Sequence, residues 1–332
     1  MRNKNIDLIK GVALIFVILV HSLIYTGFYD RTIVGLNDAF YVFLRSVFIS
    51  CVPLFIMTTG FLMNKHEPSK KYYKNIIKVI VTYVIVSIIQ TIIKSNDLPI
   101  KLIIKDIFNF SGANYSWYVK MYFGLFLLIP FLNILFINLK KKEKQSLILT
   151  LIVMSSLTAF KGPGINSLVP NWWNLYPLIY YFLGAYLRCY NKLELKWDFK
   201  ILLVMLMFNT LFNFTNSYNE TFIGLELNNY MSIFVITSSY YMFKVLLNIK
   251  YSGNKIIEIL SKHSLTIYLM SYIFDINVYN KISFINNYFL QMILGSLIVL
   301  ILSTFISILM DKIIKTVLDK TIHKTYDKIM LK

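Results

Sequence analysis

The sequence predicts an all-α fold, a polytopic membrane helical bundle of about ten transmembrane helices with both termini in the cytoplasm. Three observations predict it: the composition, the long apolar runs and the placement of the lysines. Hydrophobic residues make up 57% of the 332 residues and charged residues only 15%. Because a soluble fold carries about 25% charged residues, most of this chain's surface must face lipid. The composition excludes a soluble enzyme, a disulfide-stapled secreted domain and a disordered chain.

Apolar runs of about 20 residues are expected to cross the bilayer, because its hydrocarbon core is about 30 Å thick. The predicted spans are Leu8–Phe28, Phe40–Met63, Ile76–Ile93, Trp117–Asn138, Ser146–Phe160, Trp172–Arg188, Phe199–Phe214, Tyr230–Leu247, Ser264–Asn280 and Tyr288–Met310. The first run has the basic start of a signal peptide, but no small-residue cleavage site follows it. We therefore expect it to remain as a membrane anchor.

Positive charge accumulates on one side of the predicted membrane. The chain has 34 lysine and arginine residues against 16 aspartate and glutamate residues, which gives a net charge of +18. When the N-terminus is placed in the cytoplasm and the spans alternate, most basic residues fall in cytoplasmic loops, as the positive-inside rule describes. Membrane orientation therefore accounts for the charge, and nucleic acid is not expected as a partner.

The C-terminal segment is predicted to differ from the membrane domain. Residues 1–310 are expected to form the transmembrane domain, and residues 311–332 a basic amphipathic cytoplasmic tail. Ile313, Ile314, Val317 and Leu318 lie on one side of this tail, which favours a position along the inner leaflet, with protein docking as the alternative. A similar stretch, Leu98–Phe110, is expected on the outer side.

The chain has two cysteines, Cys51 and Cys189. Their spacing is not that of metal ligands, and no metal is expected. Ordinary buried thiols are the simpler interpretation, and a covalent acyl-cysteine intermediate is the alternative.

The first predicted span carries three ionisable residues, Asp7, Lys10 and His21. Lys10 and His21 are eleven residues apart. That interval is about three helical turns, so the two share one helix face and lie about 16 Å apart along the axis. Asp7 lies on the same stripe. We expect one line of polar groups from the inner interface to the outer half of the membrane.

His21 lies past the midpoint of an apolar span, where an ionised group is costly. A neutral imidazole avoids that cost, and it accepts a proton through one nitrogen and donates through the other, as a general base requires. The alternative is a structural histidine bonded to a neighbouring helix. Lys10 likewise has two interpretations, a functional cation or an anchor that snorkels to the headgroups.

The first span has a basic residue that is separated from a histidine by ten residues. This pattern resembles the characteristic motif of the acyltransferase-3 family of integral-membrane acyltransferases. Here the pattern runs from Lys10 to His21, with lysine where the family usually has arginine. Lysine keeps the charge but loses the planar two-pronged contact. Other segments resemble family motifs in the same order: Val52–Leu62 with Thr59 for serine, Tyr115–Tyr118 with Tyr122 and Pro130, Tyr176–Tyr186, and Ser264–Ser271 with serine for a final histidine.

The resemblance implies O-acylation, usually acetylation, of a sugar hydroxyl on a cell-envelope or exported glycan, with acetyl-CoA as the acyl donor. No racemase-sized or esterase-like domain is expected beside the membrane region, so the chain resembles the stand-alone bacterial type. The expected location is the bacterial plasma membrane, with many spans. The expected partners are membrane lipid and a glycan or lipid-linked glycan acceptor; the sequence predicts no particular oligomeric state.

The family chemistry suggests a role for each candidate residue. Lys10, Lys71 and Lys74 would bind the CoA phosphates at the cytoplasmic mouth. His21 would deprotonate the sugar hydroxyl or, as an alternative, accept the acyl group itself. Asp7 would hold Lys10 in place.

Aromatic and basic residues near the outer side form a candidate acceptor site. Trp117, Tyr118 and Tyr122 suit sugar stacking, and an ordinary interfacial belt is the alternative. Arg45 and Lys120 would pair with Asp275 or snorkel outward, and a proton exit through Asp275 is a further option. Glycines 11 and 60 are expected to allow close helix packing.

Two non-enzymatic interpretations compete with the acyltransferase. A transporter or a flippase for a lipid-linked glycan would also have many spans and buried polar groups, but it predicts inverted repeats and paired broken helices, which the sequence does not clearly contain. A scaffold that binds glycan synthesis proteins is the other interpretation. In a scaffold, His21 would be dispensable.

Overall fold

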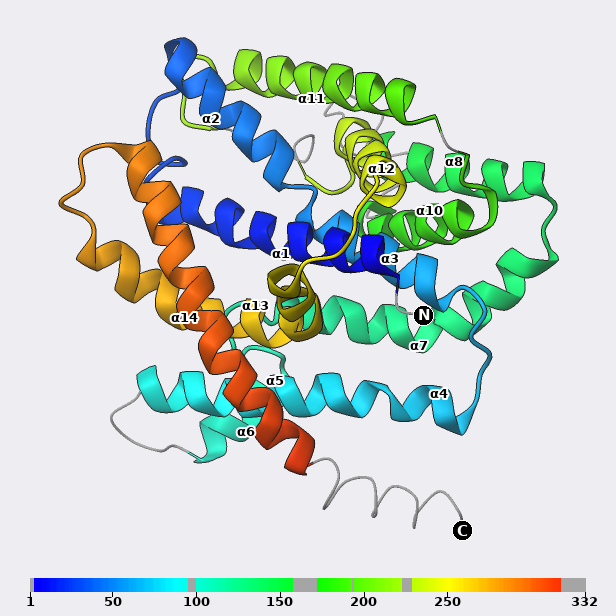
Figure 1. The fold of residues 1–332 in the computed structure, drawn as a ribbon, viewed down its shortest axis with the longest axis horizontal. Helices are drawn as coiled ribbons and strands as arrows, with labels where there is room; N and C mark the ends of the chain where they lie inside the picture. The colour runs from blue at the N-terminus through cyan, green and yellow to red at the C-terminus, as the bar shows by residue number, and fades with distance from the viewer. Residues whose placement is uncertain (1–2, 95–99, 158–171, 193, 223–228, 318–332) are drawn as a thin grey trace. The chain divides into compact units, whose positions relative to one another are not determined.

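The described chain is built from helices (Figure 1). The structure is a computed structural model that describes residues 3–94, 100–157, 172–192, 194–222 and 229–317. Within these ranges, extended pairing is limited to two isolated β-bridges, Thr32 with Thr221 and Ile33 with Tyr218. The predicted all-α membrane fold is confirmed.

The helices follow the order of the predicted spans, with additional short elements between them. Their bounds are α1 Lys4–Tyr25, α2 Gly35–Phe48, α3 Cys51–Met63, α4 Lys70–Lys74, α5 Ile76–Lys94, α6 Ile100–Phe108, α7 Trp117–Asn138, α8 Lys141–Leu157, the 3-10 helix η1 Trp172–Leu175, α10 Tyr176–Tyr190, α11 Leu195–Ser217, α12 Ile233–Asn248, α13 Lys255–Lys281 and α14 Tyr288–Val317. Helix α7 has the same bounds as the span predicted there.

Five helical segments among the described residues are long and apolar enough to cross a membrane: Lys4–Tyr25, Gly35–Met63, Lys70–Ile93, Trp117–Asn138 and Tyr288–Thr316. Ile233–Asn248 is a shorter apolar helix. Helix α13 carries five charged residues within its length, which is more than any of these segments. The count of ten spans and the cytoplasmic position of both termini stay predictions.

The second predicted span is two helices rather than one. Helix α2 ends at Phe48 and α3 begins at Cys51, with Ile49 and Ser50 in a turn between them. Pro53 has no backbone N–H, so it cannot bond the carbonyl of Ile49, and proline fits best in the first turn of a helix, where Pro53 lies in α3. Pro53 therefore explains why the helix restarts here.

Contacts divide the chain into two compact units. The first unit comprises Met1–Lys65 and Asn133–Ser261, and the second comprises His66–Leu132 and Lys262–Lys332. In the first unit, α10 packs extensively on α3, α1 packs on α3, and α11 packs on α12 and α2 (Figure 1).

Glycines bring α3 and α10 together in the first unit. A Cβ on Gly60 would lie 2.0 Å from the carbonyl oxygen of Tyr181, and a Cβ on Gly184 would lie 2.0 Å from that of Met57. Only glycine at both positions permits this backbone contact. The predicted packing role of Gly60 is confirmed, and its partner is Gly184.

The first unit also holds the other predicted packing glycine and the exposed cysteine. A Cβ on Gly11 would lie 3.1 Å from the side chain of Ile257, so Gly11 also sits at a close helix contact, as expected. Cys51 is buried, but Cys189 is exposed, which differs from the expectation of two buried thiols.

The second unit is held by hydrogen bonds from buried polar side chains to backbone carbonyls. The Tyr72 hydroxyl in α4 donates to the carbonyl of Phe126 in α7 at 2.6 Å, and the two rings stack. The Gln90 amide in α5 donates to the carbonyl of Leu269 in α13 at 2.8 Å. These bonds tie α4 and α5 to α7 and α13.

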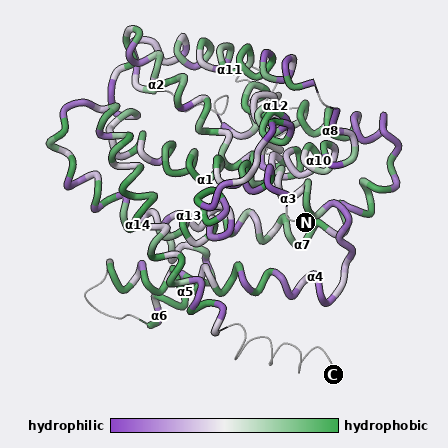
Figure 2. The backbone as a smooth tube through the Cα atoms, viewed as in Figure 1, coloured by the Kyte–Doolittle hydropathy of each residue, from purple (hydrophilic) through white to green (hydrophobic). Residues whose placement is uncertain are grey.

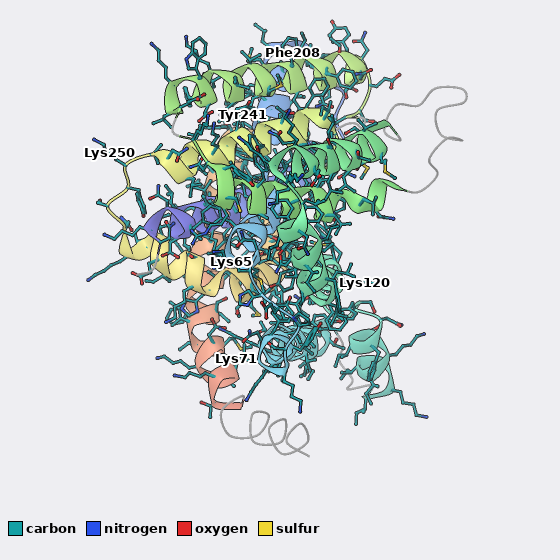
Figure 3. The ribbon with its side chains drawn as sticks, turned by 90° about the vertical axis from the view of Figure 1, so that its right-hand side faces the viewer. Lys65, Lys71, Lys120, Phe208, Tyr241 and Lys250 are labelled. Atoms are coloured by element: carbon teal, nitrogen blue, oxygen red, sulfur yellow. The ribbon has the colours of Figure 1, made fainter. Side chains whose placement is uncertain are left out.

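Large apolar side chains cover the outer faces of several helices. Figure 2 shows hydrophobic residues along the helices and hydrophilic residues gathered near helix ends and loops. In the first unit, α11 exposes Met207, Phe208 and Leu211, and Figure 3 labels Phe208 on this helix. Exposed apolar faces of this kind are expected where helices meet lipid.

Helix α14 crosses the predicted boundary between membrane domain and tail. It continues past Met310 to Val317, and Ile314 is fully buried whereas Ile313 is exposed. Leu318 and the rest of the predicted tail lie outside the described residues. The predicted outer amphipathic stretch contains helix α6, which exposes Ile100, Ile104 and Phe108 one turn apart.

Candidate functional site

Helix α1 carries Asp7, Lys10 and His21, and all three side chains are half-buried. Asn3 caps the helix, because its side-chain oxygen accepts from the backbone nitrogens of Asn5 and Ile6. The helix then runs unbroken to Tyr25. The predicted helical spacing therefore holds, and Lys10 and His21 share a face about 16 Å apart along the axis.

The polar residues of α1 lie near its two ends and do not form a continuous line along the helix. Leu14 and Val17 lie on the face between Lys10 and His21, and they are 0% and 4% exposed. The expected stripe of polar groups is thus interrupted by about two turns of apolar residues. A molecule that reaches from Lys10 to His21 would pass apolar side chains.

The N-terminal end of α1 is hydrogen-bonded to α12, to α13 and to the connection between them. The Ser261 hydroxyl donates to Asp7 Oδ1 at 2.7 Å, and the Lys4 ammonium donates to the carbonyl of Ser252 at 2.6 Å. The Asn5 amide donates to the carbonyls of Leu246 and Ile249 at 2.9 Å and 2.8 Å. The contact with Ser261 was not predicted, because nothing in the sequence links two residues so far apart.

A pocket of about 310 Å³ opens at this end of α1. It is lined by Lys4 and Asp7 of α1, by the connecting residues 251–254 and by Lys255 and Glu258 of α13. Gly253 adopts a φ of +97°, which favours glycine, and the Lys4 side chain packs against it. The pocket carries two basic and two acidic side chains.

His21 lies one turn before the C-terminal end of α1. The following loop is anchored, because the backbone nitrogen of Ile33 donates to the carbonyl of Glu220 at 2.8 Å and that of Asn219 donates to the carbonyl of Ile33 at 3.0 Å. Thr32 and Ile33 of this loop are thereby paired with the segment that follows α11. This pairing fixes where the end of α1 with His21 lies within the first unit.

Arg45, near the end of α2, is surrounded by aromatic rings in the first unit. Its side chain is buried, its Nε donates to the Tyr29 hydroxyl at 3.2 Å, and its guanidinium lies 5.2 Å from the centre of the Phe222 ring. Arg31 nearby pairs with Asp38 at 3.4 Å. Aromatic faces stabilise a buried guanidinium, so these contacts position Arg45.

Asp275 is held by a tyrosine hydroxyl in the second unit. Among the described residues its partner is Tyr115, whose hydroxyl donates to Asp275 Oδ2 at 2.7 Å. Asp275 is fully buried, and its Oδ1 has no hydrogen-bond partner among the described residues. Of the two alternatives for Lys120, its exposure favours snorkelling, and a pairing of Asp275 with Arg45, which belongs to the first unit, stays a prediction.

The predicted sugar-stacking residues lie together at the start of α7 in the second unit. The rings of Tyr118 and Tyr122 stack with centres 6.3 Å apart, and Trp117 lies 6.1 Å from Tyr118. Tyr118 also contacts Tyr268 of α13, at 6.0 Å. Tyr268 stacks in turn on Tyr115, the residue that holds Asp275.

The predicted phosphate-binding residues are divided between the units. Lys10 belongs to the first unit, and Lys71 and Lys74 belong to α4 in the second. Ser69 caps α4, because its hydroxyl accepts from the backbone nitrogen of Tyr72 at 3.2 Å. Lys71 is exposed and Lys74 is half-buried; Figure 3 labels Lys71 on α4 and Lys120 on α7.

Sequence reasoning missed a histidine–aspartate pair. His263 Nδ1 contacts Asp311 Oδ2, and the Thr266 hydroxyl donates to Asp311 Oδ1 at 2.7 Å. This cluster joins α13 to α14. His263 directly precedes a predicted span, which was a usable signal, but the carboxylate that orients it comes from another helix. No group of three His, Cys, Asp or Glu that could hold a metal ion occurs in the described part of the chain.

Comparison with known proteins identifies the family. Residues 3–312 match the acyltransferase domain that defines the acyltransferase-3 family, which is nearly the whole chain. No curated protein and no solved structure matches the chain. Together with the apolar helices, this match shows that the chain belongs to the acyltransferase-3 family and is a membrane-integral acyltransferase.

Proposed function

We propose that the protein transfers an acetyl group from acetyl-CoA to a sugar hydroxyl of a cell-envelope or exported polysaccharide in the bacterial plasma membrane. The supporting observation is the placement of His21, half-buried near one end of the unbroken helix α1, about three turns from Lys10. An imidazole within an apolar helix suits proton transfer, because it is stable there without charge.

In the proposed reaction, His21 accepts the proton of the sugar hydroxyl as its oxygen attacks the thioester carbonyl. The tetrahedral intermediate then expels the CoA thiolate, and the imidazolium returns the proton to that sulfur. The carbon–oxygen bond of the ester forms, the carbon–sulfur bond breaks, and no net proton is released. His21 therefore needs no permanent proton exit.

The charged residues at the other end of α1 are proposed to bind the donor. Lys10, with Lys71 and Lys74, would neutralise the CoA phosphates, and the pantetheine arm would pass the apolar face of Leu14 and Val17. The Asp7 carboxylate, bonded to Ser261, would fix this end of α1 relative to α13.

The aromatic residues of α7 are proposed to bind the acceptor. Trp117, Tyr118 and Tyr122 offer ring faces for a sugar, and Trp117 is 40% exposed. Arg45 and Lys120 would supply hydrogen-bond donors to glycan oxygens.

The function is tested by incubating membranes that contain the protein with acetyl-CoA labelled in the acetyl group. Label should enter a polysaccharide or lipid-linked glycan fraction, and mild base should release it because the product is an ester. Membranes without the protein are the control. Equal labelling in both preparations, or label that is found only in protein, would contradict the proposal.

A further inference from the structure

A second pocket, between α8, α10 and α12 of the first unit, has an apolar interior and a polar mouth. Its volume is about 270 Å³. The apolar lining consists of Ile148, Leu149 and Ile152 of α8, Leu183 of α10 and Ile236 of α12. Leu149 is 61% exposed, so the pocket is a groove that opens toward the surroundings of the helices. We call this site the α8 groove.

Three polar lining residues, Gln145, Tyr186 and Tyr240, form one end of the α8 groove, and a fourth, Thr237, follows Ile236 on α12. The Gln145 amide donates to the Tyr186 hydroxyl at 2.8 Å, and Tyr240 also lines the groove. Gln145 precedes Ile152 by seven residues on α8. The polar mouth and the apolar interior are therefore separated by about 10 Å along the helix.

Two ammonium groups lie beside this mouth. The Tyr186 and Tyr190 rings have centres 4.9 Å apart, and the Nζ atoms of Lys141 and Lys144 lie 5.4 Å and 5.7 Å from the centre of the Tyr190 ring. The Lys144 Nζ also lies 5.0 Å from the centre of the Phe136 ring. Lys144 is only 8% exposed, and no ion pair involves it among the described residues.

A buried ammonium that contacts only aromatic rings within the described structure favours an anion at its open side. An apolar groove with basic groups at one end matches a phospholipid, whose acyl chain is apolar and whose phosphate is negative. The lysines at the start of α8 are predicted to be cytoplasmic, where anionic lipids give the membrane surface its negative potential.

We propose that the α8 groove binds one anionic phospholipid of the inner leaflet, with an acyl chain along Ile148, Ile152 and Ile236 and the phosphate beside Lys141 and Lys144. This site is separate from α1 and does not depend on the proposed acetyl transfer. The lipid would stabilise the packing of α8 on α10 and α12.

Native mass spectrometry of the full chain, delipidated in a non-ionic detergent and titrated with phosphatidylglycerol or phosphatidylcholine, tests the site. The wild type should retain one phosphatidylglycerol, and phosphatidylcholine should bind about fivefold more weakly or worse. Equal binding of the two lipids would overturn the proposal. Inorganic phosphate at millimolar concentration should not displace the lipid; complete displacement would show an anion site without a lipid chain and would also overturn it.

Two substitutions should block the groove from opposite walls, Ile152→Trp in α8 and Thr237→Trp in α12. Each should abolish retention of phosphatidylglycerol. Val153→Trp is the matched control, because Val153 is the next residue of α8, is 45% exposed and does not line the groove. If a folded blocking variant retains as much phosphatidylglycerol as the Val153→Trp protein does, the proposed site is refuted.

The charged end is tested separately. Lys144→Gln should weaken phosphatidylglycerol binding about fivefold, because one cation beside the phosphate is lost. Lys142→Gln is the control, since Lys142 is exposed and does not contact the Tyr190 ring in the structure. Equal weakening by both substitutions would show a general charge effect and would contradict the assigned phosphate position.

Discussion

Replacing Gly184 by alanine should disrupt the crossing of α3 and α10. The added Cβ would lie 2.0 Å from the carbonyl oxygen of Met57, whereas ordinary contact begins at 3.4 Å. The backbones would have to separate by about 1.4 Å at this point. Because the obstacle is backbone rather than a flexible side chain, neither helix can avoid the clash by a rotamer change.

The cost can be estimated from two opposing effects. Overpacking of this kind costs about 3 kcal/mol or more, and alanine recovers about 1 kcal/mol of helix propensity. Gly184→Ala should therefore destabilise the protein by at least about 2 kcal/mol, which corresponds to a decrease in Tm of at least about 3 °C for a chain of 332 residues.

Thermal unfolding of the purified protein in detergent measures the effect. Gly124→Ala is the matched control, because Gly124 is also helical but a Cβ at that position would meet no neighbouring atom within 4 Å. The control should leave Tm unchanged or raise it slightly. A Gly184→Ala protein that is as stable as the Gly124→Ala protein would show that α3 and α10 do not cross as closely as the structure indicates.

Three other substitutions test the remaining contacts. Tyr115→Phe removes the hydroxyl that donates to the fully buried Asp275, so the free energy of unfolding should fall by about 3 kcal/mol. The double variant Tyr115→Phe, Asp275→Asn should recover part of this loss, and an unchanged Tm in the single variant would contradict the contact. Lys244→Met leaves the buried Asp198 without its ammonium partner at 2.7 Å and should lower the free energy of unfolding by about 3 kcal/mol. The double variant Lys244→Met, Asp198→Leu should lose less stability, and equal losses would show that the two residues are not coupled. Lys10→Ala should raise the KM for acetyl-CoA more than it lowers kcat, and an unchanged KM with only acceptor use affected would place the donor elsewhere.

Hydrophobic run length predicts where helices form in this chain but not how they pair. The bounds of α7 and the start of α14 at Tyr288 follow from the sequence, because long apolar runs need helical hydrogen bonding in lipid. Lipid-facing and protein-facing sides of such helices are both apolar, so periodicity does not reveal the buried face. The pairing of Gly60 with Gly184 was therefore visible only in the structure.

Local chemistry explains the other differences. Pro53 lies inside the run that was predicted as one span, and it indicated that the helix could be interrupted there, between α2 and α3. The partners of ionisable groups were not readable, since Tyr115 reaches Asp275 and Asp311 reaches His263 across large sequence separations. Charge complementarity suggested an ion pair for Asp275 as one alternative, whereas the structure shows a neutral hydroxyl bonded to one of its two carboxylate oxygens.

The role of His21 is tested most directly by single-turnover acetyl transfer with the purified protein, labelled acetyl-CoA and the acceptor glycan. His21→Ala should slow transfer by about 100-fold or more, while the amount of folded membrane protein stays the same. His66→Ala is the matched histidine control, because His66 is exposed, and it should transfer at the wild-type rate. A His21→Ala protein that transfers acetyl within twofold of the His66→Ala protein would contradict the base role of His21.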